Sequence, residues 1–236
     1  RYLATQSLRD LVAEGRTWEI GEDEGCSDES AVIIRERLLG QVFAVSSQIV
    51  DEGICSMEDV DRGAKVGLRW ANGPFELANR IGVIEAVRMA SVYAAEAGLN
   101  LPDWFTDRKE LFDFSYIDVE VEDSIATVRI NRPEAMNALN VTLVSQLGEA
   151  LDELNTRDDV TTIVLEGAGK AFVAGADVKF FVDKIRANAI QDIYDFTAHG
   201  HAVLDKLESS PKTTIALTTG LALGGGLELA LACDYR

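Results

Sequence analysis

Apolar residues recur at helical spacing through most of the first hundred residues. Gly53 and Gly98 each follow such a run, in the position where glycine commonly ends a helix. Ser56, with Asp59 three residues later, is typical of a helix start, and Pro74 suits a first helical turn because no N–H is needed there. The pattern predicts helices over about residues 31–52, after Ser56, after Pro74 and over 84–97.

The pattern changes in the second half of the chain. Two short β-prone runs, at residues 161–165 and 213–217, precede segments rich in small residues, at 171–177 and 222–230. Each of these segments leads toward a helical pattern. A small-residue turn at such a point leaves backbone N–H groups unpaired and directed at whatever binds there.

Two such turns, brought together, would direct two N–H donors at one oxygen, as in an oxyanion hole. Glu228 follows Gly225 by three residues, so an acid or base would lie one helical turn from a donor. The alternatives are close packing of a strand on a helix and an ordinary tight turn. Nucleotide-binding loops fit less well. Leu227 and Glu228 stand where a phosphate-binding loop needs Lys and Ser/Thr, and Leu229 replaces the third glycine of a dinucleotide-binding loop.

Three segments in order, residues 126–139, 172–177 and 222–234, resemble motifs of the crotonase (enoyl-CoA hydratase) superfamily. The resemblance runs from about Ile117 to the last residue. It implies an α/β fold built as a crotonase-type ββα spiral, of which residues 117–236 hold only the N-terminal half. It also implies an acyl-CoA thioester as substrate and no cofactor in this part of the protein.

The resemblance further implies roles for individual residues. In the superfamily, two glutamates add water to a 2-enoyl-CoA to give a 3-hydroxyacyl-CoA, and Glu228 matches one of them. The backbone N–H groups of Ala176 and Gly225 would hold the thioester oxygen, so bulky replacements there should be more damaging than most changes nearby. Lys179 would face phosphate. The residues implied in contact with substrate and CoA are Ala135, Met136, Ala174, Ala176, Asp177, Val178 and Lys179.

In hydratases the second glutamate lies beyond the helix that Glu228 begins, past Arg236. We therefore expect the chain to be truncated at both ends and to belong to a longer, homo-oligomeric enzyme. Two other reactions use the same fold with different acid and base groups: isomerisation of an enoyl-CoA and hydrolysis of an acyl-CoA. A non-catalytic acyl-CoA-binding or assembly fragment is a further alternative.

Residues 48–54, 58–61 and 73–77 resemble the C-terminal helical domain of 3-hydroxyacyl-CoA dehydrogenases. The NAD-binding domain and catalytic histidine of such an enzyme would lie upstream of Arg1. The domain order is similar to that of a bifunctional 3-hydroxyacyl-CoA dehydrogenase/enoyl-CoA hydratase, whose activities are consecutive steps of fatty-acid β-oxidation. We expect a helical dehydrogenase-type domain over residues 1–100, an aromatic linker over 101–116 and a crotonase-like domain over 117–236.

The linker is strongly aromatic, whereas flexible linkers are rich in Gly and Ser. We therefore expect residues 101–116 to pack onto one domain and to fix the orientation of the two.

The net charge of −18 argues against nucleic acids and anionic membranes as partners, because both are negatively charged and repel an acidic protein. The charge is spread evenly, with −9 up to Ser115 and −9 beyond it. No apolar run reaches the about 20 residues that span a membrane. CoA is itself anionic, so Arg132, Lys170 and Lys179 near the motifs are expected to offset the repulsion locally.

Three widely spaced cysteines, Cys26, Cys55 and Cys233, indicate reduced thiols in a cytoplasm. The chain has two histidines, His199 and His201. Residues two apart on a helix point away from each other, so we expect no metal site there.

Overall fold

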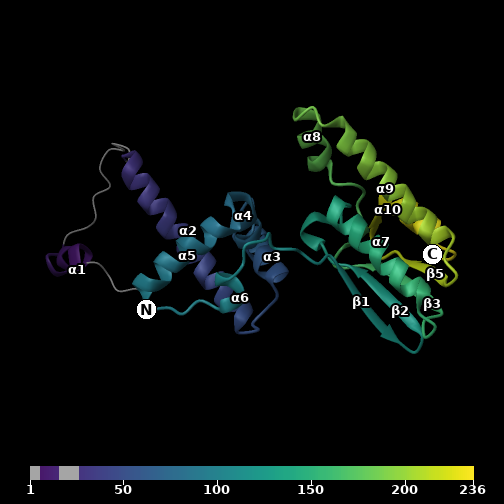
Figure 1. Cartoon of the computed structure of the whole chain (residues 1–236), viewed down its shortest axis with the longest axis horizontal. Helices are drawn as coiled ribbons and strands as arrows, with labels where there is room; N and C mark the ends of the chain where they lie inside the picture. Colours follow the sequence, from purple (N-terminus) through teal and green to yellow (C-terminus); the bar gives the residue numbers. More distant parts are fainter. Residues whose placement is uncertain (1–5, 16–26) are drawn as a thin grey trace.

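Helices α2 (Asp28–Asp51) and α5 (Val83–Ala97) pack along each other at the centre of the N-terminal half (Figure 1). The computed structural model describes residues 6–15 and 27–236. The two helices approach closely because Gly40 of α2 faces α5, where a Cβ would lie 2.4 Å from the carbonyl oxygen of Met89. The other helices of this half are α1 (Gln6–Ala13), α3 (Met57–Gly67), α4 (Pro74–Ile81) and α6 (Asp103–Thr106).

Local capping signals define the ends of these helices. The predicted start at Ser56 is confirmed, since its Oγ accepts the backbone N–H of Asp59 at 3.1 Å. The predicted end at Gly98 is also confirmed, with a left-handed φ of 68°. The first long helix begins earlier than expected, at Asp28, because the Ser27 hydroxyl already accepts an N–H of the first turn.

Helix α4 is capped by a side chain from another helix. Asp61 of α3 is 1% exposed and accepts the backbone N–H groups of Phe75 (2.8 Å) and Glu76 (2.9 Å). Gly73 precedes the helix because a Cβ there would lie 2.1 Å from Cγ of Asp61. Burial raises the pKa of Asp61 to about 6, although the two N–H donors lower it.

We expect Asp61 to make the fold less stable as the pH rises through the window from 3.8 to about 6. The native carboxyl keeps its proton up to about pH 6, whereas the unfolded one loses it near 3.8, so this contribution to stability is complete below 3.8 and is lost above 6. Asp61→Asn should remove about 2–3 kcal/mol of pH dependence. Urea unfolding at both ends of the window measures it. The exposed Asp28→Asn is the control, and parallel profiles for parent and Asp61→Asn would contradict the assignment.

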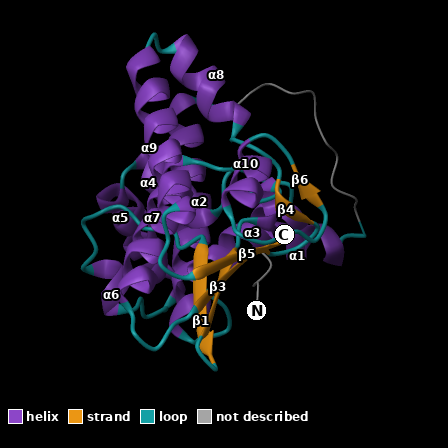
Figure 2. Ribbon diagram, turned by 90° about the vertical axis from the view of Figure 1, so that its right-hand side faces the viewer, coloured by secondary structure: helices purple, strands orange, loops and turns teal. Residues whose placement is uncertain are grey.

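A four-stranded sheet in the order β1-β2-β3-β5 forms the centre of the second half (Figure 2). Strands β1 and β2 are antiparallel, whereas β2, β3 and β5 run parallel. Both β-prone runs predicted from the sequence are confirmed as β3 and β5. The bounds are β1 (Ile117–Glu122), β2 (Ile125–Ile130), β3 (Thr162–Gly167) and β5 (Thr213–Leu217).

Helices α7 (Val141–Thr156) and α9 (Ile190–Glu208) pack on each other beside this sheet (Figure 1). Apolar residues one turn apart on α7, Leu147 and Leu151, are buried against the sheet with Leu165 of β3. Two shorter helices, α8 (Val178–Arg186) and α10 (Gly225–Ala232), contact α9. No helix within residues 6–15 and 27–236 combines the length and the apolar character that crossing a membrane requires.

The aromatic segment between the halves contacts both cores, and not one domain alone as we expected. Phe105 and Phe112 are buried in the helical core, whereas Tyr116 packs against the core of the sheet. Gln146 of α7 holds this end of the segment. Its Nε2 donates to the carbonyl of Phe114 at 2.7 Å, and its Oε1 accepts the N–H of Tyr116 at 2.8 Å.

A second, two-stranded sheet holds the small-residue segments together. Strands β4 (Ala171–Val173) and β6 (Leu221–Ala222) pair in parallel, and the N–H of Leu223 donates to the carbonyl of Val173 at 3.0 Å. Helix α10 then packs against β4, with Gly226 at the point of contact: a Cβ there would lie 2.0 Å from the carbonyl oxygen of Val173. This pairing places the C-terminal ends of β4 and β6 side by side.

Two cysteines lie in the described part of the chain and both are free: Cys55 is half-buried and Cys233 is buried. Burial raises the pKa of the Cys233 thiol to about 11, which keeps it protonated and unreactive at neutral pH. Cys26 lies outside the described residues. Across those residues, no group of three or more His, Cys, Asp and Glu side chains is placed to hold a metal ion.

Candidate active site

The two small-residue turns meet just beyond β4 and β6. Gly175 and Gly224 have φ values of 89° and 47°, in the region that side chains disfavour. A Cβ on Gly175 would lie 3.4 Å from the carbonyl oxygen of Leu223, and one on Gly224 would lie 3.8 Å from Cα of Gly175. The two backbones are therefore in direct contact.

Ala176 and Gly225 follow these glycines, and each has a backbone N–H with no acceptor among the described residues. Both residues line one pocket of about 190 Å³. Gly225 is the first residue of α10, where the N–H groups of the first turn have no partner within the helix and carry the positive end of its dipole. The pocket thus presents two donors from two separate turns.

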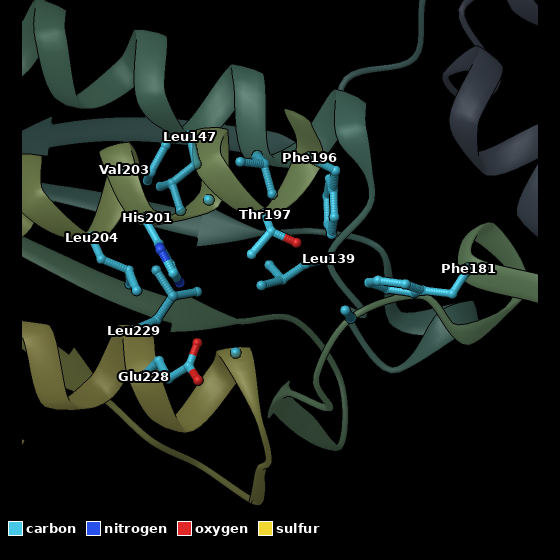
Figure 3. A pocket seen from close by; sticks show the side chains of 14 residues that line it. Leu139, Leu147, Phe181, Phe196, Thr197, His201, Val203, Leu204, Glu228 and Leu229 are labelled. Carbon is cyan, nitrogen blue, oxygen red and sulfur yellow. The ribbon is translucent and has the colours of Figure 1, made fainter. Parts of the chain in front are cut away.

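Glu228 lies one turn further along α10, and its side chain lines the same pocket (Figure 3). Its Oε2 lies 4.0 Å from the position that a Cβ on Gly225 would take. The carboxylate makes no hydrogen bond or ion pair with any other described residue. It is therefore available to bind a water molecule or to accept a substrate proton beside the two donors.

The other pocket walls come from α7, α8 and α9, which the sequence analysis did not connect with the site. Phe181 of α8 and Phe196 of α9 meet nearly edge-on, with ring centroids 5.8 Å apart. Thr197 and His201 are polar residues that line the pocket from α9. The His201 ring extends from α9 toward α10 (Figure 3). In the sequence, small and polar residues on an otherwise apolar helix face were the signal that could have identified these pocket residues. The remaining apolar lining residues are Leu139, Val144, Leu147, Val203, Leu204 and Leu229.

Asn137 fixes the loop between β2 and α7 against β4. It is fully buried and has a positive φ of 57°. Its Nδ2 lies 2.8–3.1 Å from the carbonyl oxygens of Ala168, Ala171 and Phe172, and its Oδ1 accepts the N–H of Arg132 at 2.9 Å. Asn137 lies within the motif at residues 126–139, but its role could not be predicted from the sequence because only the folded chain brings these carbonyls around it.

We expect Asn137→Asp to destabilise the fold by about 3 kcal/mol or more. The oxygen that replaces Nδ2 would be buried against the carbonyl oxygens of Ala168, Ala171 and Phe172 and has no proton to donate to them. Asn140→Asp is a matched control. Asn140 caps α7 by accepting the N–H of Leu143 at 2.8 Å, and aspartate performs this role equally well. Urea unfolding followed by circular dichroism measures both variants. Equal stability of the two would contradict the role given to Asn137.

The other residues implied in CoA binding lie outside this pocket. Asp177 caps α8 and accepts a hydrogen bond from Nη2 of Arg132 at 2.9 Å. Lys179 and Ala135 line a second cleft. Among the rest, Val178 is 72% and Met136 is 54% exposed, and the carbonyl of Met136 accepts the N–H of Ala174. The structure thus brings Ala176, Gly225 and Glu228 together in one pocket and places Lys179 and Ala135 in another cleft.

Two protein families match the chain. The family described as enoyl-CoA hydratase/isomerase matches residues 120–236. The second half is a crotonase-family domain. The family described as 3-hydroxyacyl-CoA dehydrogenase, C-terminal domain, matches residues 34–107, so a dehydrogenase-type helical domain precedes the crotonase domain.

Similar proteins include enzymes of more than one reaction type. The crotonyl-CoA hydratase of Syntrophomonas wolfei is 38% identical over 124 residues, which cover 52% of this chain and 46% of that protein. The 4-chlorobenzoyl coenzyme A dehalogenase-2 of an Arthrobacter species is 41% identical over 120 residues, which cover 50% and 43%. A solved structure from Pseudomonas aeruginosa is 34% identical, has a TM-score of 0.50 and shares 53% of each chain. The chain therefore spans about half the length of these relatives.

Proposed function

We propose that the crotonase domain binds an acyl-CoA thioester and adds water to a 2-enoyl-CoA, giving a 3-hydroxyacyl-CoA. The observation that carries this proposal is the meeting of two unpaired N–H groups, of Ala176 and Gly225, beside the unpaired carboxylate of Glu228 in one largely apolar pocket.

The arrangement fits the electron movements of hydration. When hydroxide attacks the β-carbon, negative charge develops on the thioester oxygen, and the N–H groups of Ala176 and Gly225 would stabilise it. Glu228 would orient the water and take its proton. The α-carbon then needs a proton from a carboxylic acid. The apolar walls from α7 and α9 limit competition from bulk water.

We infer the position of CoA from the resemblance and from the residues that line the pocket and the second cleft. The acyl group would occupy the pocket, and the pantetheine would pass Ala174, Ala176 and Asp177 toward Val178 and Lys179. Ala135 and Met136 would border it from the preceding loop. Asp177 does not face the ligand as a free charge, because Arg132 pairs with it at 2.9 Å.

The helical domain supports a wider proposal for the parent protein. Dehydrogenases of this family use NAD, and we infer that the full-length protein is a bifunctional 3-hydroxyacyl-CoA dehydrogenase/enoyl-CoA hydratase of β-oxidation, homo-oligomeric and cytoplasmic. Both histidines of the chain, His199 and His201, lie on α9 of the crotonase domain. The helical half of this chain contains no histidine, so the proposal assigns neither the dehydrogenation nor the NAD site to residues of this chain.

One observation favours a second candidate, isomerisation of a 3-enoyl-CoA to a 2-enoyl-CoA. Glu228 is the one carboxylate among the described residues that line the pocket, and a single base can move a proton between the α- and γ-carbons. Hydration requires a second acid to protonate the α-carbon.

Mass spectrometry with two substrates separates these candidates. With crotonyl-CoA, we expect loss of the conjugated-thioester absorbance and a product heavier by one water. An isomerase would instead convert 3-hexenoyl-CoA to a conjugated product of the same mass. If crotonyl-CoA and 3-hexenoyl-CoA both bind tightly but neither is converted, the domain is an acyl-CoA-binding module and not an enzyme. If neither binds, the proposal is refuted.

A further inference from the structure

A second cleft, of about 480 Å³, lies between the helical domain and the crotonase domain. One wall comes from the end of α3, the following loop and α4, and the other comes from the loop after β2 and the start of α8. Figure 1 shows α3 and α4 on the side of the helical domain that faces the crotonase domain. The cleft therefore belongs to neither domain alone.

Hydrogen bonds and one ion pair join the two walls. Arg62 of α3 donates from Nη2 to Oδ1 of Asn131 at 3.1 Å and from Nε to Oε2 of Glu134 at 3.3 Å. Glu58 of the same helix accepts the N–H of Ser115 at 2.9 Å. These bonds fix α3 against the loop that the crotonase motif uses to border CoA.

The cleft is positively charged in a strongly acidic protein. Its lining contains four cationic side chains, Lys65, Arg80, Arg132 and Lys179, and two acidic ones, while the whole chain carries −18. Lys65 pairs with Glu76 at 2.6 Å, and Arg132 pairs with Asp177.

Two of the four cations have no acidic partner. The Arg80 guanidinium donates only to the neutral amide of Asn72, at 3.1 Å, and the Lys179 ammonium has no partner among the described residues. They face the cleft from opposite domains. This is an arrangement that attracts phosphate groups.

An aromatic ring completes the helical wall. Trp70 lines the cleft and is 38% exposed, and its backbone N–H donates to the carbonyl of Ala64 at 3.2 Å, which holds it at the end of α3. An exposed indole beside unpaired cations suits a purine base that carries phosphates, because the base stacks on the ring while the cations bind the phosphates.

The cleft and the catalytic pocket are adjacent along the chain. Ala176 lines the pocket, and Lys179, three residues later, lines the cleft, so at most about 10 Å of backbone separates them. A ligand with its acyl group in the pocket and a phosphorylated purine on a flexible tether would reach both. CoA has this form. The inference rests on the proposed function, because it takes an acyl-CoA as the ligand of the pocket.

We propose that the helical domain completes the nucleotide end of the acyl-CoA site. Trp70 stacks on the adenine, and Arg80 binds the phosphates opposite Lys179. The dehydrogenase-type domain is then a substrate-binding part of the hydratase as well as a packing unit.

Calorimetry on the full chain, with three ligands, tests this proposal. The ligands are CoA, adenosine 3′,5′-bisphosphate and crotonyl-pantetheine, which has the thioester but no nucleotide. Trp70→Ala and Arg80→Gln should weaken binding of CoA and of the bisphosphate by about 5- to 100-fold. Binding of crotonyl-pantetheine should stay at the parent value. The control, Arg88→Gln, removes the same charge from an exposed site on α5 that pairs with Glu36 and Glu85.

The outcomes separate this inference from the proposed function. If Trp70→Ala and Arg80→Gln bind CoA as well as Arg88→Gln does, while Lys179→Gln binds it more weakly, the inference fails and the proposed function stands. An equal loss for CoA and crotonyl-pantetheine would also overturn it, because the variants would then disturb the whole site. If the parent chain binds neither CoA nor crotonyl-pantetheine, both claims fail.

Discussion

Replacing Gly226 by alanine is expected to prevent the catalytic pocket from forming. A Cβ at this position would lie 2.0 Å from the carbonyl oxygen and 2.7 Å from Cβ of Val173, both rigid parts of β4. Helix α10 would have to withdraw, which separates the turn that carries Gly225 from the turn that carries Ala176. We expect a loss of about 3 kcal/mol or more in the free energy of unfolding. Thioester binding should be lost with it.

The same replacement one residue earlier is a strict control. A Cβ on Gly225 would lie 2.9 Å from Cδ1 of Leu139, the far end of a flexible side chain, and its backbone N–H would remain. Gly225→Ala should therefore fold with a stability within about 1 kcal/mol of the parent. Urea unfolding and calorimetry with CoA measure both variants. If Gly226→Ala is as stable as Gly225→Ala and binds CoA like the parent, the packing of α10 on β4 does not hold the pocket together.

This contrast shows how far sequence reasoning reaches. Spacing and motif alone single out Gly225, because it supplies a donor, and predict that bulk there is damaging. The tightest steric constraint lies at Gly226, and it depends on a strand of three residues pairing with a strand of two, with paired residues 49 or 50 positions apart. Strands this short carry almost no periodic signal, so their pairing was not predicted.

Local signals were reliable where the physics is local. Serine caps and glycine ends defined helices in the first half, since each depends on atoms within one turn. The cap on α4 was different, because Asp61 reaches it from α3. Similarly, Thr197 and His201 became pocket residues only when α9 packed against α7 and α10. Residues whose role needs a partner from another element were the ones that the sequence analysis missed.

Glu228→Gln is expected to leave ligand binding intact and to lower turnover by about 10²- to 10⁴-fold, the usual contribution of a positioned acid or base. The amide has the shape of the carboxylate but does not accept a proton from water. The substitution breaks no hydrogen bond or ion pair, because the native carboxylate bonds to no other described residue. The loss should therefore fall on kcat, with the affinity for CoA unchanged. Glu208→Gln, at the end of α9, removes one negative charge elsewhere and should retain full activity.

The result also bears on which group moves the proton. Turnover within tenfold of the parent would contradict the role of Glu228 and direct attention to His201, the other titratable side chain that lines the pocket. A fall in CoA affinity equal to the fall in turnover would mean that Glu228 shapes the pocket and takes no part in the chemistry. Loss of kcat alone is the result that the geometry demands. The two N–H donors would still hold the thioester oxygen, and only the proton acceptor would be missing.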